Sequence, residues 1–230
     1  MNILAFGAHP DDIEFGCAAV LILEAARGNS VKLRVLSRGE AGSHGTPEGR
    51  ELESRAAAAI MGAEVDFLDF GGDCHIEYNT ANVIRIAREI RAAQPHVVLA
   101  PHPSENQHPD HATVARLVRD ACRFARYGGL KELADVQPHR VGSLLFYNIT
   151  KHLGEAPDFV IDITSAVDKW EAAMSCHASQ VGSKGYIEMQ KTAAHVLGLA
   201  SGAQYAIGLF ANDPILAPSL ADLSRSARTY

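Results

Sequence analysis

The chain has 230 residues, of which 47% are hydrophobic and 21% are charged, and its formal net charge at pH 7 is -6. This length supports one sizeable core, so we expect a single domain over residues 1–230, with a core part to about residue 130 and a C-terminal extension of the same domain. A net negative charge disfavours nucleic acid and anionic membrane surfaces as partners. We therefore expect a small-molecule partner.

The first residues of the chain and its cysteines indicate in which cellular compartment the protein acts. The apolar run in MNILAFGAHPDD is too short for a secretory signal and lacks a basic flank, and no stretch approaches the length of a bilayer span. The four cysteines form no CxxC pair, which disfavours a disulfide framework and a thiolate zinc knuckle. We expect a cytoplasmic protein with reduced thiols, and we interpret the pairs Cys74–His75 and Cys176–His177 as chance neighbours.

Apolar runs and helical periodicities alternate along the chain. A strand over Asn2–Gly7 is followed by a helix over Ile13–Arg27, which Gly28 closes. The next elements in order are strand Val31–Ser37, helix Pro47–Met61, strand Val65–Phe70, helix Ala81–Ala92, strand His96–Ala100 and helix Pro109–Arg126. This alternation predicts an α/β fold: a Rossmann-like, doubly wound and mostly parallel sheet with helices on both faces.

The alternation loosens after Gly128. The predicted elements there are strands Val141–Tyr147 and Phe159–Ile163 and helices Ser165–Ala178 and Tyr186–Leu199. Two loops, Arg38–Gly49 and Gly71–Asn79, follow strands and should lie at the sheet edge where ligands bind. We expect the tail from Asp213 to Tyr230 to pack outward or against another subunit.

Two polar segments are expected to meet at that edge. In a doubly wound sheet the first and fourth strands are neighbours, and the crevice beyond their carboxyl ends binds ligands. The first strand leads into AHPDD (residues 8–12), and the fourth leads into PHPSENQHPDH (residues 101–111). A catalytic zinc takes three ligands from His and carboxylate and leaves a position for water. His9, Asp12 and His111 fit this requirement, so we predict one zinc ion per chain.

The residues beside these ligands suggest catalytic roles. Adjacent carboxylates at Asp11 and Asp12 are unfavourable unless a cation neutralises one and the other acts as a base, so Asp11 is the predicted general base. Pro109 suits the first helical position, which places His108 at the cap and His111 in the first turn. One of these histidines can then ligate the metal while the other stabilises charge.

A purely structural interpretation competes with this one. Asp11 and Glu14 have the spacing of a capping box, and Asp110 near a helix start is favoured by the helix dipole. Such caps do not explain why His9 and His111 also gather at the same crevice. We therefore favour the functional interpretation.

Three segments resemble those of the PIG-L/LmbE-like zinc deacetylases: AHPDD at 8–12, GEAGSHGTPEGR at 39–50 and HPDH at 108–111. Within that family they are similar to the group that deacetylates N-acetylglucosaminyl malate in bacillithiol biosynthesis. The resemblance covers nearly the whole chain. It implies zinc binding by His9, Asp12 and His111, a base at Asp11, and a His108 that stabilises the tetrahedral intermediate or protonates the leaving amine.

The resemblance also implies substrate contacts and an assembly state. Arg50 matches an arginine that lines the family's pocket, and Tyr205 either offers a hydroxyl to the oxyanion or is a buried structural residue. Family members commonly carry an acidic residue near the Tyr-Ala-x-x-Phe region, whereas residues 205–210 here read YAIGLF. The family often forms trimers or hexamers, so the resemblance implies a homo-oligomer.

The predicted reaction is zinc-dependent hydrolysis of the N-acetyl group of an N-acetylglucosamine-type conjugate. A rival is a two-metal phosphoesterase, because His102, Asp73 and His75 are expected at the same edge and offer a second set of ligands. A third interpretation, a silent sugar- or metal-binding module, is disfavoured by Asp11. A nucleotide-binding oxidoreductase is disfavoured because neither a Walker pattern nor GxGxxG follows the first strand.

Overall fold

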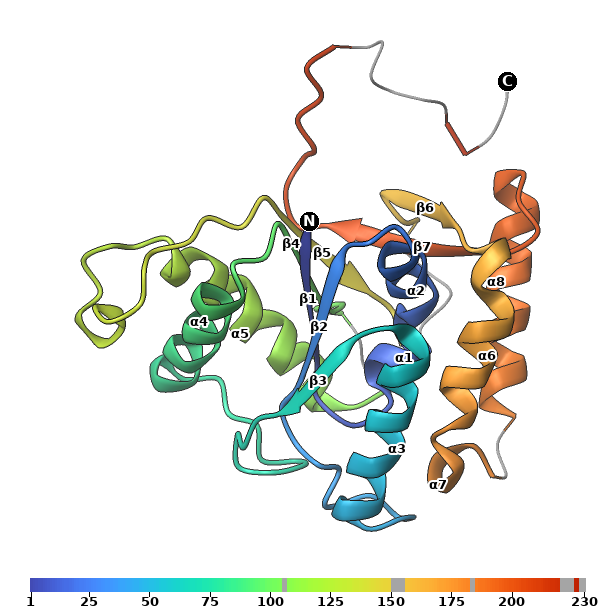
Figure 1. Ribbon diagram of the computed structural model, residues 1–230, viewed down its shortest axis with the longest axis horizontal. Helices are drawn as coiled ribbons and strands as arrows, with labels where there is room; N and C mark the ends of the chain where they lie inside the picture. Colours follow the sequence, from blue (N-terminus) through green and yellow to red (C-terminus); the bar gives the residue numbers. More distant parts are fainter. Residues whose placement is uncertain (105–106, 150–155, 183–184, 220–225, 228–230) are drawn as a thin grey trace.

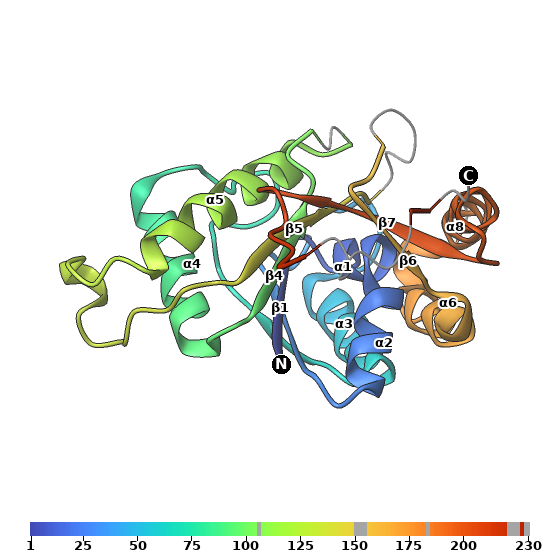
Figure 2. The same ribbon diagram turned by 90° about the horizontal axis from the view of Figure 1, so that it is seen from above.

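The computed structural model describes residues 1–104, 107–149, 156–182, 185–219 and 226–227. These residues form one seven-stranded sheet of order β3-β2-β1-β4-β5-β7-β6 with helices on both faces (Figures 1 and 2). The strands are β1 (Asn2–Gly7), β2 (Ser30–Val35), β3 (Glu64–Phe67), β4 (Val97–Pro101), β5 (Ser143–Tyr147), β6 (Phe159–Asp162) and β7 (Ala206–Ala211). Strands β1 to β5 run parallel and β7 is antiparallel to both of its neighbours. The predicted α/β architecture is confirmed.

The helices divide between the two faces of the sheet. They are α1 (Asp12–Gly16), α2 (Ala18–Ala26), α3 (Pro47–Met61), α4 (Thr80–Ala93), α5 (Pro109–Ala125), α6 (Val167–Ser175), α7 (Ala178–Val181) and α8 (Tyr186–Ser201). Helices α4 and α5 pack side by side on one face, and α2, α3 and α6 cover the other (Figures 1 and 2).

The alternation of side chains along β1 explains why both faces are covered. Ile3 and Ala5 belong to the core under α2, α3 and α6, whereas Leu4 and Phe6 belong to the core under α4 and α5. All four are buried, so successive side chains in the middle of the strand face apolar neighbours on opposite sides of the sheet. A strand without a polar face is stable only in the middle of such a sheet.

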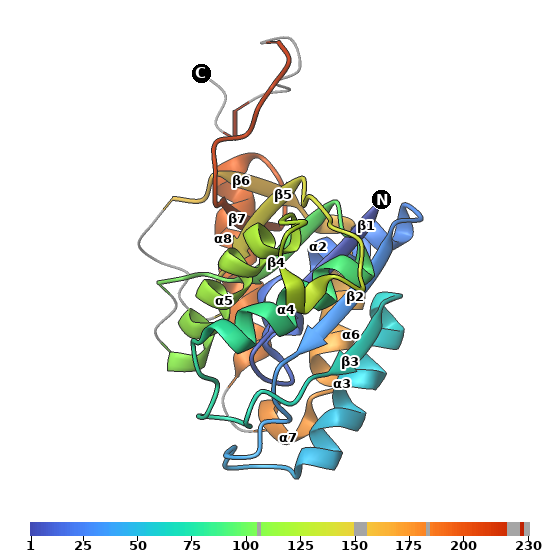
Figure 3. The same cartoon turned by 90° about the vertical axis from the view of Figure 1, so that its left-hand side faces the viewer.

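The structure corrects several predicted elements. The predicted helix Ile13–Arg27 is two helices, because the backbone leaves the helical region at Cys17 (φ -146°). The predicted strand Val65–Phe70 is shorter, and β7 was not predicted at all. Residues 213–219 of the tail extend away from the body of the molecule (Figures 1 and 3).

The order of the strands places the two polar segments together, as predicted. Strands β1 and β4 pair in parallel, with Ile3 opposite Val97 and Ala5 opposite Leu99, so AHPDD and the segment before α5 leave the same edge of the sheet. Among the described residues no helix has the length and apolar character needed to cross a bilayer. The cytoplasmic location, the homo-oligomeric state and the absence of nucleic-acid partners stay predictions.

Candidate active site

The AHPDD segment folds into a turn that Asp12 holds together. The Asp12 Oδ2 atom accepts hydrogen bonds from the backbone N–H groups of Ala8 (2.8 Å) and His9 (2.9 Å). Asp11 adopts a left-handed backbone conformation with φ 114°, which non-glycine residues rarely tolerate outside functional sites. His9 and Asp12 are both buried, so this turn places an imidazole and a carboxylate at the end of β1.

The second segment brings two more histidines to the same point. His108 is the N-cap of α5, with Pro109 in the first turn, and its side chain accepts a hydrogen bond from the Asp110 N–H. His111 lies one turn further along, with its Nε2 atom 3.1 Å from the Asp12 Oδ1 atom. Ligand atoms of His9, Asp12 and His111 lie within 4.8 Å of one another. The structure therefore assembles the predicted ligand set.

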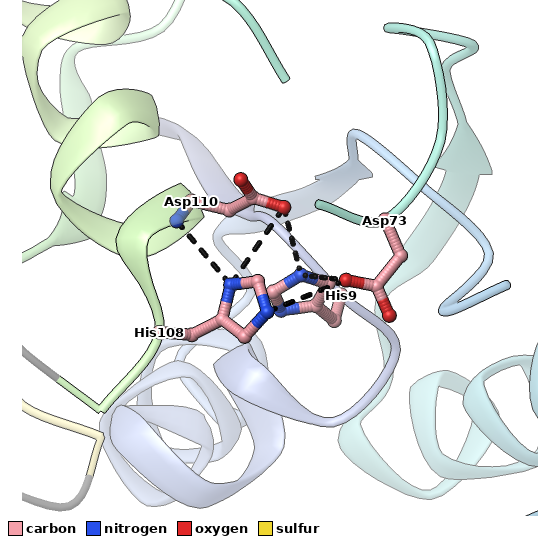
Figure 4. A group of neighbouring side chains, drawn as sticks. All are labelled: His9, Asp73, His108 and Asp110. Carbon is pink, nitrogen blue, oxygen red and sulfur yellow. Dashed lines mark hydrogen bonds and ion pairs between the residues drawn. The ribbon is translucent and has the colours of Figure 1, made fainter. Parts of the chain in front are cut away.

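The two nitrogen atoms of His9 face different partners. Nε2 lies 3.1 Å from the Asp73 Oδ1 atom and 3.2 Å from the Asp110 Oδ2 atom (Figure 4), whereas Nδ1 faces the Asp12 carboxylate at 3.6 Å. Two carboxylates at Nε2 favour the tautomer with the proton on that atom. The lone pair of Nδ1 then faces Asp12, as in metal sites where a carboxylate orients a ligating histidine.

The charge of this group suits a divalent cation. Burial opposes the protonation of His9, but the facing carboxylates of Asp12, Asp110 and Asp73 raise its pKa well above the usual value. Burial likewise opposes ionisation of Asp12, yet His111 and His9 hold the pKa of that carboxyl well below its usual range. The site therefore attracts positive charge. Imidazole and carboxylate donors around a pocket are the ligands that catalytic zinc uses.

Asp11 stands beside this group with a different electrostatic character. Burial and the neighbouring Asp12 carboxylate raise the pKa of Asp11 to about 6, although Arg50 opposes the shift. The Arg50 Nη2 atom lies 3.5 Å from Asp11 Oδ2 and donates to the Pro10 carbonyl (2.9 Å), while Nη1 donates to the Gly39 carbonyl (3.0 Å). Asp11 is thus a carboxylate whose proton affinity suits a general base near neutral pH.

The close approach of Arg50 explains a glycine of the GEAGSHG segment. Gly39 has φ +71°, and a Cβ atom there would collide with the Arg50 guanidinium. Arg50 was predicted to line the pocket after β2, and it does so from the first turns of α3 while remaining buried. Because its Nη atoms contact backbone carbonyls and Asp11, Arg50 fixes the AHPDD turn rather than standing free for an anionic substrate.

A pocket of about 220 Å³ is lined by all the predicted catalytic and metal-binding residues and, of the two predicted substrate-binding residues, by Arg50 but not by Tyr205. Its lining consists of His9, Asp11, Asp12, Phe15, Arg50, Asp73, Gln107, His108, His111, Ile149, Gln180, Tyr186 and Gln190. The side chain of His108 is 29% exposed, the most open of the three histidines. Burial and the neighbouring His9 lower the pKa of His108, so its ring is neutral at pH 7.

Two further predictions concern Tyr205 and the N-cap of α1. Tyr205 is absent from the pocket lining, is partly buried, and packs its ring 5.2 Å from that of His195, so its contact with the oxyanion stays a prediction. Asp11 makes no side-chain hydrogen bond as the N-cap of α1, so the alternative capping box is wrong.

Of the second ligand set that the phosphoesterase interpretation required, only Asp73 joins the group. The ring of His102 packs 4.5 Å from that of Phe210, and the Nδ1 atom of His75 faces the Asp73 backbone carbonyl at 2.8 Å. Neither histidine lines the pocket around His9. The structure therefore does not assemble that set.

Other contacts were not anticipated from the sequence. His177, interpreted as a chance neighbour of Cys176, is fully buried with its Nε2 atom 3.2 Å from the Glu14 carboxylate. Gln180 on α7 lines the pocket and donates to the His44 carbonyl (3.0 Å), which ties α7 to the Arg38–Gly49 loop. The short polar segment His177–Gln180 is the sequence signal that would have found them.

Comparison with known proteins supports this arrangement. The family described as PIG-L, GlcNAc-PI de-N-acetylase, matches residues 4–122, which include the AHPDD and HPDH segments. The 4-oxalmesaconate hydratase of Pseudomonas putida is 29% identical over 195 residues, which are 78% of this chain and 74% of the hydratase.

Solved structures with the same fold cover almost the whole chain. A conserved protein from Thermus thermophilus has a TM-score of 0.86 and 32% identity, covering 97% of this chain and 99% of that one. The N,N'-diacetylchitobiose deacetylase from Pyrococcus horikoshii has a TM-score of 0.82 and 22% identity, covering 96% of this chain and 88% of that one. At 22% identity, the likeness to this deacetylase shows that the two chains share a fold.

Proposed function

Because this chain belongs to the PIG-L family of de-N-acetylases, we propose that it hydrolyses the N-acetyl group of an N-acetylglucosamine-type conjugate with one zinc ion per chain. The observation that carries the proposal is the position of Asp11. It lines the same pocket as His9, Asp12 and His111, and its pKa is raised to about 6. A ligand set alone binds a metal, whereas a ligand set beside a base of this kind supports hydrolysis.

The proposed chemistry divides between the metal and the chain. When bound by His9, Asp12 and His111, zinc supplies Lewis acidity toward the amide carbonyl and a water molecule. The Asp11 carboxylate takes one proton from the water as its oxygen bonds to the carbonyl carbon. Asp11 then returns that proton to the amide nitrogen as the carbon–nitrogen bond breaks, which releases acetate and a free amine. The pKa of Asp11 is about 6 in the metal-free protein, and a cation next to Asp12 lowers it from there, so Asp11 is an ionised carboxylate that can accept the proton at pH 7.

His108 stabilises the charge that develops during this reaction. Its Nδ1 atom accepts from the Asp110 N–H, so the neutral ring carries its proton on Nε2. An N–H donor in a partly buried pocket stabilises an oxyanion more strongly than water does. Asp73 and Asp110 hold His9 in the tautomer that leaves Nδ1 for the metal, and Arg50 fixes the turn that carries Asp11.

The space for the rest of the substrate lies along α8. A second hollow of about 930 Å³ runs along α8 and shares Phe15 and Gln190 with the site, which gives room for an aglycone. N-acetylglucosaminyl malate, the substrate in bacillithiol biosynthesis, is the first conjugate to test because the AHPDD and HPDH segments resemble those of that group. An acidic aglycone would meet an Arg50 already engaged with Pro10, Gly39 and Asp11.

A hydratase is the second candidate, and the likeness to the Pseudomonas putida hydratase favours it. Hydration also begins with a water molecule and a base, so Asp11 would serve either reaction. The two candidates differ in what binds: a polycarboxylate needs free cationic groups. Among the described residues lining the pocket, Arg50 is the only arginine or lysine, and its Nη atoms are engaged. This favours deacetylation.

A substrate panel on the zinc-loaded protein tests the proposal. It contains N-acetylglucosaminyl malate, N-acetylglucosamine, N,N'-diacetylchitobiose and 4-oxalmesaconate, with acetate release and loss of the conjugated double bond measured in parallel. We expect acetate release from at least one acetamido sugar, and we expect Asp11→Asn to lower its rate by roughly 10²–10⁴-fold. Hydration of 4-oxalmesaconate without acetate release from any sugar would instead establish the hydratase.

A further inference from the structure

Three side chains of different chemistry form an almost equilateral triangle, and two of them, Asp73 and His108, also line the pocket. The Cys74 Sγ atom lies 3.4 Å from Asp73 Oδ1 and 3.5 Å from His108 Nε2, and the latter two atoms are 3.5 Å apart. Sulfur, carboxylate oxygen and imidazole nitrogen therefore converge on one point. The triangle shares no residue with the ligand set of His9, Asp12 and His111, although its Asp73 Oδ1 atom also lies 3.1 Å from His9 Nε2.

These separations match those of ligands on a tetrahedral metal. Zinc bonds of about 2.0–2.1 Å to nitrogen or oxygen and about 2.3 Å to sulfur place neighbouring ligand atoms about 3.3–3.6 Å apart. All three edges of the triangle lie in or near that range. Cys74 is exposed and the side chain of His108 is 29% exposed, so two of the three donors are accessible from solvent, whereas Asp73 is 8% exposed. A cation can therefore reach these two donors from solvent.

The loop that carries Cys74 is held in place before any cation binds. Gly71, Gly72 and Cys74 all have positive φ angles, and the Cys74 N–H donates to Asp110 Oδ2 (2.9 Å). The Asp73 N–H donates to Glu40 Oε2 (2.8 Å), which adds a third carboxylate to those of Asp73 and Asp110. The surroundings are thus negative and the donors are preorganised, which lowers the cost of binding a cation.

We propose that Asp73, Cys74 and His108 form a second, inhibitory cation site that prefers thiophilic ions such as zinc in excess or cadmium. Binding forms a metal–sulfur bond as the thiol proton passes to solvent, and a thiolate ligand selects these ions over magnesium. At His108 the metal occupies Nε2 and the ring proton moves to Nδ1, which breaks the hydrogen bond that Nδ1 accepts from the Asp110 N–H (3.3 Å) and leaves Nδ1 facing the Asp110 carboxylate at 3.7 Å (Figure 4).

The inhibitory part of this inference rests on the proposed function, because it depends on His108 contacting the reacting amide. With Nε2 bound to a cation, His108 has no N–H to offer an oxyanion. The binding part is independent of the reaction. A second ion that activated the enzyme would point to two-metal chemistry instead.

Cadmium titration of the zinc-loaded holoenzyme tests both parts. We compare the wild type with Cys74→Ser, Cys74→Ala and the matched thiol control Cys176→Ser, which lies outside the triangle. Dialysis with elemental analysis counts bound cadmium, ultraviolet absorption detects the thiolate–cadmium band, and acetate release reports activity. Cys74 is not part of the proposed catalytic machinery, so both Cys74 variants should turn over like the wild type without cadmium.

The expected result is a cadmium equivalent beyond the resident zinc, with a thiolate band and inhibition that rises with occupancy. Both Cys74 variants should lose the band and need at least ten times more cadmium for half-inhibition, whereas Cys176→Ser should match the wild type. The inference would be overturned if the thiolate–cadmium band persisted in the Cys74 variants. It would also be overturned if the wild type bound no cadmium beyond the resident zinc, or if the extra cadmium activated the enzyme. If no sugar is deacetylated, the band and the stoichiometry still decide whether the site exists.

Discussion

Two buried polar clusters of this protein use charge in opposite ways. Arg91, near the end of α4, is 2% exposed and donates four hydrogen bonds of 2.6–2.9 Å to the backbone carbonyls of Ala125, Tyr127, Leu133 and Val136. Around His9, in contrast, the carboxylates of Asp12, Asp73 and Asp110 face one imidazole. The first cluster is complete within the chain, and the second has a surplus of negative charge.

This difference in charge balance distinguishes the structural cluster around Arg91 from the functional cluster around His9. The Arg91 guanidinium ties the end of α5 and the following loop to α4, and nothing from outside would improve its contacts. The carboxylates around His9 repel one another unless a cation enters, so this cluster gains from a ligand that the chain does not supply. We expect substitutions in the two clusters to affect different properties.

The largest expected effect is on catalysis. Asp11→Asn removes the base but keeps the size of the side chain, so turnover should fall by roughly 10²–10⁴-fold while zinc affinity is retained. Rates of acetate release and bound zinc are measured on the same preparations. Near wild-type turnover, or loss of zinc together with activity, would show that Asp11 is not the base.

The counterpart substitution in the structural cluster should affect stability alone. Arg91→Met leaves four backbone carbonyls without their donor, and we expect unfolding free energy to fall by about 3–5 kcal/mol. Urea unfolding provides the measurement, and Arg88→Met, an exposed arginine on the same helix, is the control with little expected change. Equal losses in both variants would remove the distinction we draw.

A smaller effect should appear in the stability of the metal-free protein. The folded pKa of Asp11, about 6, lies above the unfolded value of 3.8, so the folded state binds this proton more tightly. The resulting stability is present below about pH 4 and is lost as the pH rises through 6. Metal-free Asp11→Asn should therefore exceed the wild type in unfolding free energy by up to about 3 kcal/mol at pH 8, and this difference should narrow below pH 6 and close only below about pH 4. A difference in unfolding free energy between the two proteins that does not change with pH would contradict the raised pKa of Asp11.

The smallest predicted effect is the acidic limb of the activity profile. A general base acts only when deprotonated, so kcat/KM should fall about tenfold per pH unit below the pKa of Asp11. That limb should lie at or below pH 6, since a cation next to Asp12 shifts it further down. Zinc content is measured at each pH as the control. If kcat/KM of the fully zinc-loaded enzyme instead began to fall at a pH well above 6, a group other than Asp11 would be responsible for the fall.

The same contrast shows where sequence reasoning succeeded. The pairing of β1 with β4 follows from alternating strands and helices, and it alone brings His9 and His111 together across 102 positions. The N-cap position of His108 follows from Pro109. The strand pairing and the helix cap could be predicted because they depend on hydrophobic periodicity and on the residue types in short segments of sequence.

Other parts depend on tertiary contacts that no local pattern encodes. Asp73 reaches His9 because the positive φ angles of Gly71, Gly72 and Cys74 turn its loop inward. His177 reaches Glu14 through the packing of α6 on α1, far from any strand end. Tyr205 was assigned to the pocket from a motif, but it precedes the antiparallel strand β7 and packs on α8 instead.

Titration of the metal-free protein with zinc, followed by acetate release from the best acetamido sugar, tests the central claim most directly. We predict that activity is absent without metal, rises to a maximum at one zinc per chain, and is lost in Asp12→Asn at the same zinc concentrations. Activity in the metal-free protein, or a maximum that requires two zinc ions per chain, would contradict the account.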